Sequence, residues 1–162
     1  MAKIVRTISD DASVVATAID ATDIVSEIEQ IHKTSAVVTA ALGRLTIAAS
    51  LMGIGLKGEK DTLTLRMNGN GPTGALIAVA DSRGNVKSYV CNPVVEIPLN
   101  KYGKLDVAGA VGKEGTLSVV KDLGLKEPYC GQIPIASGEI AEDIASYFAL
   151  SLIHISEPTR RS

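Results

Sequence analysis

The segment Asn68-Gly-Asn-Gly-Pro-Thr-Gly74 contains the pattern G-x-G-x-x-G, which in dinucleotide-binding proteins holds a pyrophosphate. That chemistry requires the glycines to open a helix whose N-terminal amides bind the phosphates, with an acidic residue about 20 positions further on. Here Pro72 interrupts the pattern, residues 75–80 read as a strand, and the first acid is already Asp81. We therefore interpret these glycines as a turn between two strands.

A second glycine segment, Val107-Ala-Gly-Ala-Val-Gly-Lys-Glu114, offers the Gly-Lys pair of a P-loop. Val107 stands where the first glycine of that motif belongs, and Glu114 stands where a Ser or Thr would hold magnesium. We predict instead that Gly112 and Gly115 shape a turn before a strand that begins at Thr116.

The titratable residues do not form a recognisable catalytic set, so we predict no catalytic residue. His32 lies near the C-terminal end of a predicted helix, where an imidazolium interacts favourably with the helix dipole or helps to complete the cap. Glu139, Glu142 and Asp143 are expected in the first turns of the last helix, where acids are favoured for the same reason.

Cys91 and Cys130 are the two cysteines of the chain, and neither belongs to a C-x-x-C motif. The N-terminus shows no signal-peptide pattern, so we expect a cytoplasmic protein with buried free thiols. Two cysteines and His32 are too few for a tetrahedral zinc site, and we predict no metal or cofactor in this chain. A small-molecule enzyme with Cys91 or Cys130 as nucleophile stays open as an alternative.

The amino-acid composition argues against nucleic acid as a partner. The chain has 46% hydrophobic but only 3% aromatic residues, no Trp, and a formal net charge of -2. Its core must therefore be aliphatic, and it lacks the aromatic platform and the basic cluster that nucleic-acid binding requires. We expect no nucleic acid among its partners.

The end of the chain differs from the rest. The run Leu150-Ser-Leu-Ile-His-Ile-Ser-Glu-Pro-Thr-Arg160 looks like the translation of a sequencing adapter, so residues 150–162 are left out of fold reasoning. We expect one domain over residues 1–149, truncated at its C-terminus.

Helices and a hairpin are predicted in the first third of the chain. Residues 3–8 and 13–19 are rich in β-branched residues and predict a hairpin. Thr22 is expected to cap an amphipathic helix that runs to about Lys33. Ser35 is expected to cap the next helix.

That second helix is unusually apolar. Residues 36–56 are rich in alanine and long enough to cross a bilayer, with Arg44 as their one charge before residue 57. Because a charge in the middle of a membrane span is costly, we predict a buried core helix and no membrane partner. A further amphipathic helix is expected from Ser137.

The part of the chain after Gly58 predicts strands. They are expected at residues 62–67, 75–80, 85–91, 115–120 and 129–135. The first of them alternates, as in an antiparallel sheet with one face in solvent. We predict an α+β fold with two stacked, mostly antiparallel β-sheets, a buried Ala-rich helix and two amphipathic helices.

Several segments together resemble the redox-regulated holdase family, the 33 kDa chaperonins, from Arg6 to Ala149. They are His32-Lys-Thr-Ser35, Ala40-Ala-Leu-Gly-Arg44, Leu51-Met-Gly53, Leu56-Lys-Gly58, Gly69-Asn-Gly-Pro72, Gly103-Lys-Leu-Asp-Val107, Lys121-Asp-Leu-Gly124, Glu127-Pro-Tyr129 and Ser137-Gly-Glu-Ile-Ala-Glu-Asp143. The chain departs from the family pattern at Ala36, where Pro is usual, and at Ser88, where Gly usually precedes the Tyr.

The resemblance implies an ATP-independent molecular chaperone of the cytoplasm that binds unfolding or oxidatively damaged proteins and is often a homodimer. In the family, a linker and a C-terminal domain follow, and C-x-C and C-x-x-C thiolates there hold zinc in the reduced state. Oxidation releases the zinc and exposes apolar surface. Those four cysteines are not in this chain, so zinc and redox control are expected only for the intact parent protein.

Residues 75–80 are apolar on both faces of the predicted strand, which distinguishes them from the alternating strand before them. We expect client proteins to bind one face of this strand, either Leu76 and Ala78 or Ile77 and Val79. An adaptor domain that recognises one folded partner is a third open alternative.

Overall fold

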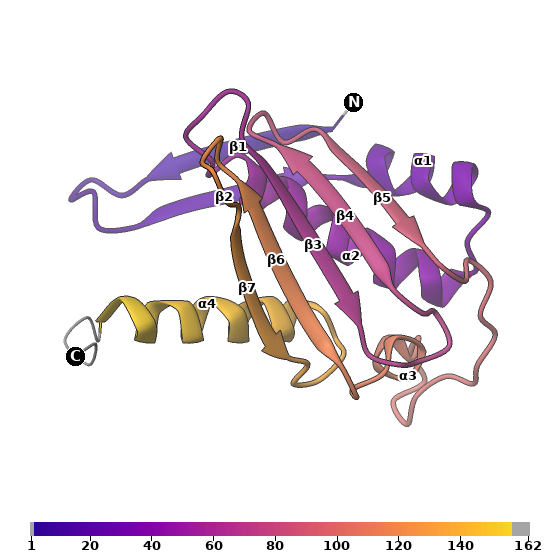
Figure 1. Ribbon diagram of the computed structural model, residues 1–162. Coiled ribbons are helices and arrows are strands. Elements are labelled where there is room, and N and C mark those ends of the chain that lie inside the picture. Colours follow the sequence, from indigo (N-terminus) through magenta and orange to yellow (C-terminus); the bar gives the residue numbers. More distant parts are fainter. Residues whose placement is uncertain (1, 157–162) are drawn as a thin grey trace.

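Seven strands and four helices make up the described part of the chain, residues 2–156 of the computed structural model (Figure 1). In chain order they are β1 (Lys3–Ile8), β2 (Val15–Asp20), α1 (Thr22–His32), α2 (Ala36–Gly53), β3 (Thr62–Asn68), β4 (Leu76–Asp81), β5 (Val86–Val90), α3 (Val107–Val111), β6 (Thr116–Asp122), β7 (Tyr129–Pro134) and α4 (Ala141–Ser156).

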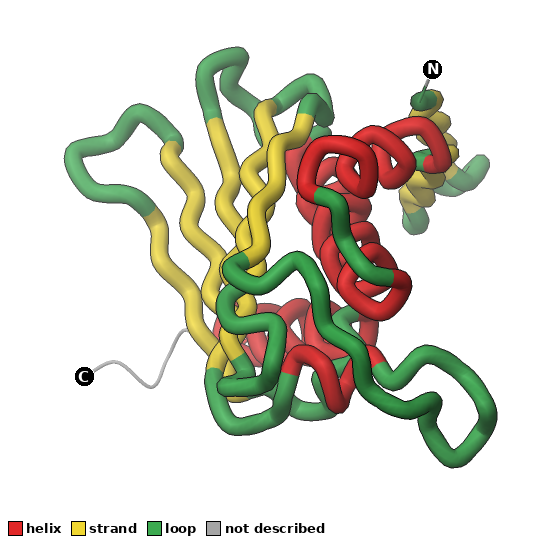
Figure 2. Tube along the Cα trace, turned by 90° about the vertical axis from the view of Figure 1, so that its right-hand side faces the viewer, coloured by secondary structure: helices red, strands yellow, loops and turns green. Residues whose placement is uncertain are grey.

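The strands form two antiparallel sheets. β1 and β2 pair as a separate hairpin, and the other five lie in the order β5-β4-β3-β6-β7. Figure 2 shows α1 and α2 between the hairpin and the five-stranded sheet. The predicted α+β fold with two antiparallel sheets is therefore confirmed, and a layer of helices separates the two sheets.

Helix α2 is the centre of the core, as its composition predicts. Leu42 and Leu45 are fully buried against the inner face of the sheet, where Leu63 and Leu65 of β3 are also fully buried. By length and composition α2 resembles a membrane span, but more than half of it is buried inside this fold, as in a core helix. Arg44 lies on its exposed side.

The alternation of β3 is confirmed by its burial. Leu63, Leu65 and Met67 point into the core, while Thr62 and Arg66 lie on the other face. The turn between β4 and β5 is held as its sequence predicts, because the Asp81 carboxylate accepts hydrogen bonds from the backbone N–H groups of Arg83 (2.9 Å) and Asn85 (3.0 Å).

The cap predicted at Thr22 is wrong by one residue. Ala21 occupies the N-cap position, and Thr22 is already helical. The reason is Asp20, whose carboxylate accepts hydrogen bonds from both the amide and the hydroxyl of Thr22 and so does the work expected of a capping side chain. The cap position of Ser35 is confirmed, but its hydroxyl bonds to the backbone of Val95 and not to its own helix.

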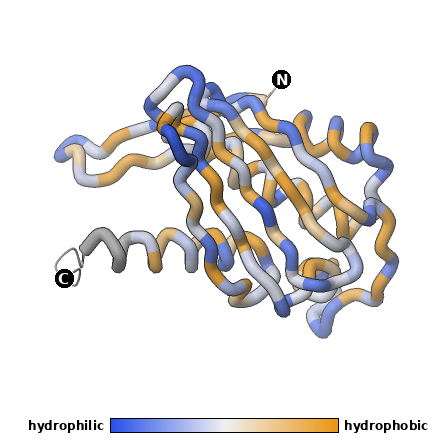
Figure 3. Tube along the Cα trace, viewed as in Figure 1, coloured by the Kyte–Doolittle hydropathy of each residue, from blue (hydrophilic) through white to orange (hydrophobic). Residues whose placement is uncertain are grey.

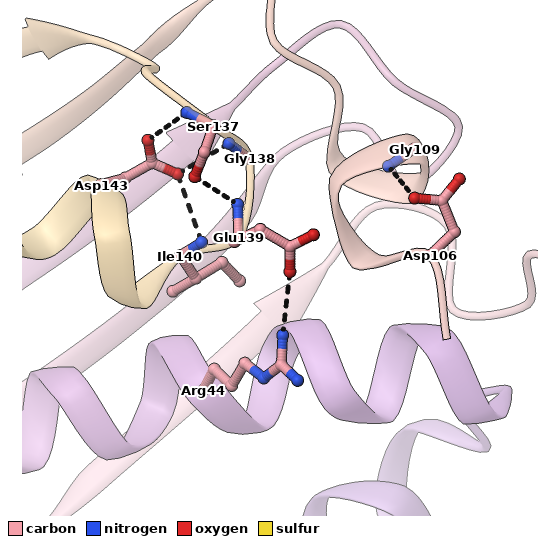
Figure 4. Close-up of polar contacts among 8 residues, drawn as sticks. All are labelled: Arg44, Asp106, Gly109, Ser137, Gly138, Glu139, Ile140 and Asp143. Carbon is pink, nitrogen blue, oxygen red and sulfur yellow. Dashed lines mark hydrogen bonds and ion pairs between the residues drawn. The ribbon is translucent and has the colours of Figure 1, made fainter. Parts of the chain in front are cut away.

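Helix α4 begins at Ala141, later than the predicted start at Ser137. The residues between them form a loop around Asp143, which is fully buried (Figure 4). Its carboxylate accepts four backbone hydrogen bonds, from Ala136 (2.7 Å) and Ser137 (2.9 Å) to Oδ1 and from Gly138 (3.0 Å) and Ile140 (3.2 Å) to Oδ2. This carboxylate ties the loop to the first turn of α4.

Two other acids expected in the first turns of α4 lie in different places. Glu142 is in the first turn, as predicted. Glu139 precedes the helix and forms an ion pair with Arg44 of α2 at 3.4 Å (Figure 4). The prediction that residues 150–162 are an adapter translation remains untested, since α4 continues to Ser156 and residues 157–162 lie outside the described part.

Helix α3 was not predicted. The expected turn before β6 is preceded by this short helix, which Asp106 caps by accepting a hydrogen bond from the backbone N–H of Gly109 at 3.0 Å (Figure 4). Gly112 ends it with φ +89°, so the turn predicted at Gly112 is confirmed.

Candidate functional site

The glycine motif of residues 69–74 is part of the fold. The segment connects β3 to β4, as predicted, and lies against the end of α3. The backbone N–H of Gly71 donates to the carbonyl of Val111 and that of Thr73 to the carbonyl of Ala110, both at 3.1 Å. Because α3 presents carbonyl oxygens to this loop and two of its amides are already bonded, the segment does not form a phosphate cradle.

The two cysteines are exposed free thiols, so the prediction of buried thiols is wrong. Cys130 lies on the edge strand β7, and Cys91 directly follows the opposite edge strand β5. Four strand spacings of about 4.8 Å separate the two edges by roughly 19 Å. The two thiols therefore do not share a metal ion or a disulfide in this fold.

Neither thiol has a basic partner in the part of the chain that the structure describes. The closest recorded contact is from Cys130 Sγ to the carbonyl of Pro128 at 3.9 Å. His32 is the last residue of α1, and its ring meets the ring of Tyr89 edge to face with 6.5 Å between centroids. Within residues 2–156, no group of three or more His, Cys, Asp or Glu residues is arranged to hold a metal ion.

In the part of the chain that the structure describes, no helix covers the outer face of the five-stranded sheet, which we define as the face opposite α2 (Figures 1 and 2). The strand register arranges its side chains in two rows across the strands. One row runs Lys87, Val79, Thr64, Val120, Cys130, and the other runs Tyr89, Ile77, Arg66, Ser118, Gln132. Each row thus combines apolar with polar side chains.

The predicted client-binding residues divide between the two faces of β4. Leu76 and Ala78 are fully buried beneath α2, so they are not accessible in this conformation. Ile77 is partly exposed on the outer face, and Val79 is 38% exposed there. Figure 3 shows β4 as hydrophobic along most of its length. Of the two alternatives, only Ile77 and Val79 offer surface to a partner.

Two apolar neighbours on the outer face were missed by the sequence analysis. Tyr89 of β5 stands beside Ile77 and is 53% exposed, and Val120 of β6 stands in the same row as Val79, with Thr64 between them. The pairing of residues 75–80 with 85–91 through the Asp81 turn was a signal that places Tyr89 opposite Ile77. Val120 is placed only by the pairing of β3 with β6, which is distant in sequence.

Other exposed apolar side chains lie outside the sheet. The hairpin exposes Val5, Ile8, Val14 and Val15, and the long connection between β5 and α3 exposes Val94, Leu99, Tyr102 and Leu105. These side chains lie on the hairpin and on a connection, whereas those of the outer face lie on paired strands of one sheet.

The edge strand β7 is fixed to α4 by two tyrosines. Tyr147 of α4 is buried, and its hydroxyl lies 3.3 Å from that of Tyr129. Burial raises the pKa of Tyr147 above its ordinary value of 10, and the hydrogen bond and the charge of Tyr129 act in the same direction. The contact joins β7 to α4, which lies on the inner side of the sheet (Figure 2).

Comparison with known proteins shows which family has this sequence and fold. The chain matches the Hsp33 protein family over residues 2–152. It is 47% identical over 149 residues to the 33 kDa chaperonin of Clostridium tetani, covering 92% of this chain and 51% of that relative. It is 50% identical over 148 residues to the 33 kDa chaperonin of Agathobacter rectalis, covering 91% of this chain and 51% of the relative.

A solved structure agrees with the sequence matches. The crystal structure of the 33 kDa chaperonin (heat shock protein 33 homologue) of Thermotoga maritima superposes with a TM-score of 0.87 at 45% identity, covering 93% of this chain and 51% of that chain. The relatives that share this fold and sequence form the class of 33 kDa chaperonins.

The chain belongs to the Hsp33 family, and the resemblance drawn from its sequence is confirmed. It spans about half the length of the relatives that it matches.

Proposed function

We propose that this chain is the client-binding core of a redox-regulated, ATP-independent holdase of the cytoplasm, which binds unfolding proteins under oxidative stress. The observation that carries the proposal is the outer face of the sheet, where Ile77, Val79, Tyr89 and Val120 lie on hydrogen-bonded strands that no helix within residues 2–156 covers. Clients are unfolding or oxidatively damaged chains, whose exposed apolar side chains have no fixed sequence.

A surface of this kind suits unspecific binding. Apolar contact stabilises a complex by about 25 cal/mol per Å², so roughly 400 Å² of covered surface corresponds to about 10 kcal/mol before the cost of ordering the client. Thr64, Arg66 and Ser118 lie between these apolar side chains and keep the outer face hydrated when no client is bound. ATP independence is proposed from the family resemblance, and the glycine segment of residues 69–74 is bonded within the fold.

The redox switch is proposed for the parent protein, on the basis of family membership. The zinc ligands of the family are four cysteines in C-x-C and C-x-x-C motifs, which this chain does not contain. Cys91 and Cys130 do not replace them, because they lie on opposite edges of the sheet. A homodimer is likewise proposed for the active form of the parent protein.

Charge insertion on the outer face tests the client-binding surface. The variant Ile77→Glu/Val79→Glu is compared with the control Val5→Glu/Val14→Glu, which inserts the same charges at exposed positions of the hairpin and its turn. We expect the outer-face variant to suppress the light scattering of a thermally unfolding client at least fivefold less well than the unmutated chain does. The control variant should suppress it as well as the unmutated chain. Equal suppression by all three proteins refutes the assignment of this surface.

The alternative of a cysteine enzyme is kept because both thiols are exposed. A catalytic thiolate reacts with an alkylating reagent at neutral pH far faster than a free cysteine does. We expect ordinary rates for Cys91 and Cys130, since neither has a basic partner among the described residues. A rate enhanced by a hundredfold or more at either thiol favours the enzyme.

A further inference from the structure

Ile140, in the loop before α4, has a backbone conformation that is rare for its residue type. Its φ is +62°, in the left-handed region, and its side chain is fully buried. A β-branched residue at positive φ is strained, because its side chain crowds the backbone. Strain of this kind persists only where the surrounding contacts fix the conformation.

Contacts on both sides of Ile140 fix this conformation. Its backbone N–H donates to Oδ2 of Asp143 at 3.2 Å (Figure 4), and its carbonyl accepts the N–H of Ile144 at 2.9 Å. The preceding residue, Glu139, forms the ion pair with Arg44 of α2. The attachment of the loop to α2 and the first turn of α4 are therefore joined through one strained residue.

Few side chains attach α4 to the rest of the domain. Among residues 141–150 only Asp143 and Tyr147 are buried, and Ile144 is partly buried. In α2, by contrast, ten residues are buried. The ring of Tyr147 packs on the edge strand β7, where a Cβ added at Gly131 would lie 3.1 Å from it. A helix with so few buried contacts opens at a lower free energy than the core of the domain does.

Opening of α4 uncovers apolar surface on the inner side of the sheet. Ile140 and Tyr147 belong to the buried core, and Ile144 packs against it. Gly131, on which Tyr147 packs, pairs with Val119, which is fully buried on the inner face. The surface that appears is therefore separate from the outer face that we assign to clients.

We propose that residues 136–140 and α4 form a strained latch, which opens as one unit while the sheet stays folded and then offers the uncovered apolar side chains to clients. The strain at Ile140 favours the open form, because there the residue returns to an ordinary φ. The role toward clients rests on the proposed function, whereas the opening of the latch does not.

Hydrogen exchange of the backbone amides of the unmutated chain, followed by NMR, tests the opening. We expect the amides of residues 144–148 to be at least about a hundredfold less protected than those of β3. The amides of Gly138 and Ile140, which bond to Asp143, should share the protection of α4. Equal protection of α4 and β3, or independent opening of the loop and the helix, overturns the proposal.

The variants Ile140→Ala and Ile140→Gly test the strain. Both lack the side chain beyond Cβ, and only alanine keeps the Cβ that opposes a φ of +62°. We expect α4 to exchange about fivefold more slowly in Ile140→Gly than in Ile140→Ala. The control Ala145→Gly changes an exposed position inside α4, where glycine is the less favourable residue, and should speed exchange. If α4 exchanges as fast in Ile140→Gly as in Ile140→Ala, the latch is not strained and the proposal fails.

The same pair of variants tests the role toward clients. Ile140→Ala, whose latch is open more often, should suppress the light scattering of a thermally unfolding client at least about twofold better than Ile140→Gly. The difference should persist when Ile77→Glu/Val79→Glu is added to both variants. Equal suppression by the two variants refutes the role of the latch in client binding. It leaves the outer face standing, because Ile77→Glu/Val79→Glu alone tests that surface.

Discussion

Asp143 offers the sharpest test of how this fold is held together. Its buried carboxylate accepts four backbone hydrogen bonds from the loop before α4, two on each oxygen. The variant Asp143→Asn keeps the shape of the side chain but replaces one acceptor oxygen with an NH₂ group. If the remaining oxygen stays at Oδ1, the bonds from Ala136 and Ser137 persist, and the amides of Gly138 and Ile140 face a donor.

The magnitude follows from the two amides that lose their acceptor. A buried N–H without a partner costs about 1–3 kcal/mol, so two of them cost roughly 2–6 kcal/mol. The two surviving bonds also weaken, because a neutral acceptor forms weaker hydrogen bonds than a charged one. Against a usual total of about 5–15 kcal/mol for a domain, this loss is large enough to shift the urea midpoint plainly.

Urea unfolding followed by far-ultraviolet circular dichroism measures the effect, since the chain has no Trp for fluorescence. The matched control is Glu142→Gln, which removes the same charge from the same turn of α4 at an exposed position. We expect Glu142→Gln to change the free energy of unfolding by less than about 1 kcal/mol. If Asp143→Asn costs no more than this control, the carboxylate does not anchor the loop and the reasoning fails.

Two further predictions concern pH. Hydrogen bonds from the hydroxyls of Ser13 and Ser9, and from the amide of Ser13, lower the pKa of Asp11 to about 2 from 3.8, so their contribution to the hairpin turn is complete above pH 4 and is lost as the pH falls toward 2. A carboxyl titration by NMR should show this low midpoint, and an ordinary midpoint for Asp11 would contradict the observed turn. Because the pKa of Tyr147 is raised by burial and by Tyr129, its contribution to stability is present below pH 10 and is lost only as the pH rises through the raised value. Absorbance at alkaline pH should show one late-ionising tyrosine that disappears in Tyr147→Phe, and simultaneous ionisation of all tyrosines would exclude the buried pair.

Local patterns in the sequence carried much of the fold. The apolar run of α2 and the alternation of β3 result from burial. Burial produces a hydrophobic pattern that is visible in the sequence even when the contacting elements are unknown. The hairpin of residues 3–20 and the Asp81 turn are likewise local structures, held by side chains a few residues apart. These elements could therefore be predicted from neighbours in the chain.

The elements that were misplaced depend on contacts that the local pattern does not show. α4 begins after Ser137 because Asp143, further along the chain, takes the amides of the preceding loop and holds them outside the helix. Helix α3 is short and its five residues, Val107–Val111, have no polar face, so no helical period is visible. The cap at Thr22 was displaced by the competing carboxylate of Asp20.

The candidate site was predictable in part. The apolar character of residues 75–80 singled out β4, but the choice between its two faces depends on which side α2 covers. The exposure of Cys130 follows from the position of β7 at the edge of the sheet, and strand order is not visible in the sequence. Val120 belongs to the site because β6 pairs with β3, and these two strands are far apart in the sequence.

The two accessible thiols, at opposite borders of a five-stranded platform, give the chain a ready pair of attachment points for spectroscopic labels. The edges are roughly 19 Å apart, and the register offsets the two cysteines by four residues along the strands, so their separation is roughly 23 Å, within the reach of electron-spin dipolar methods without an engineered cysteine. The distance between labels on Cys91 and Cys130 therefore reports whether the sheet flattens, twists or splits when a client binds.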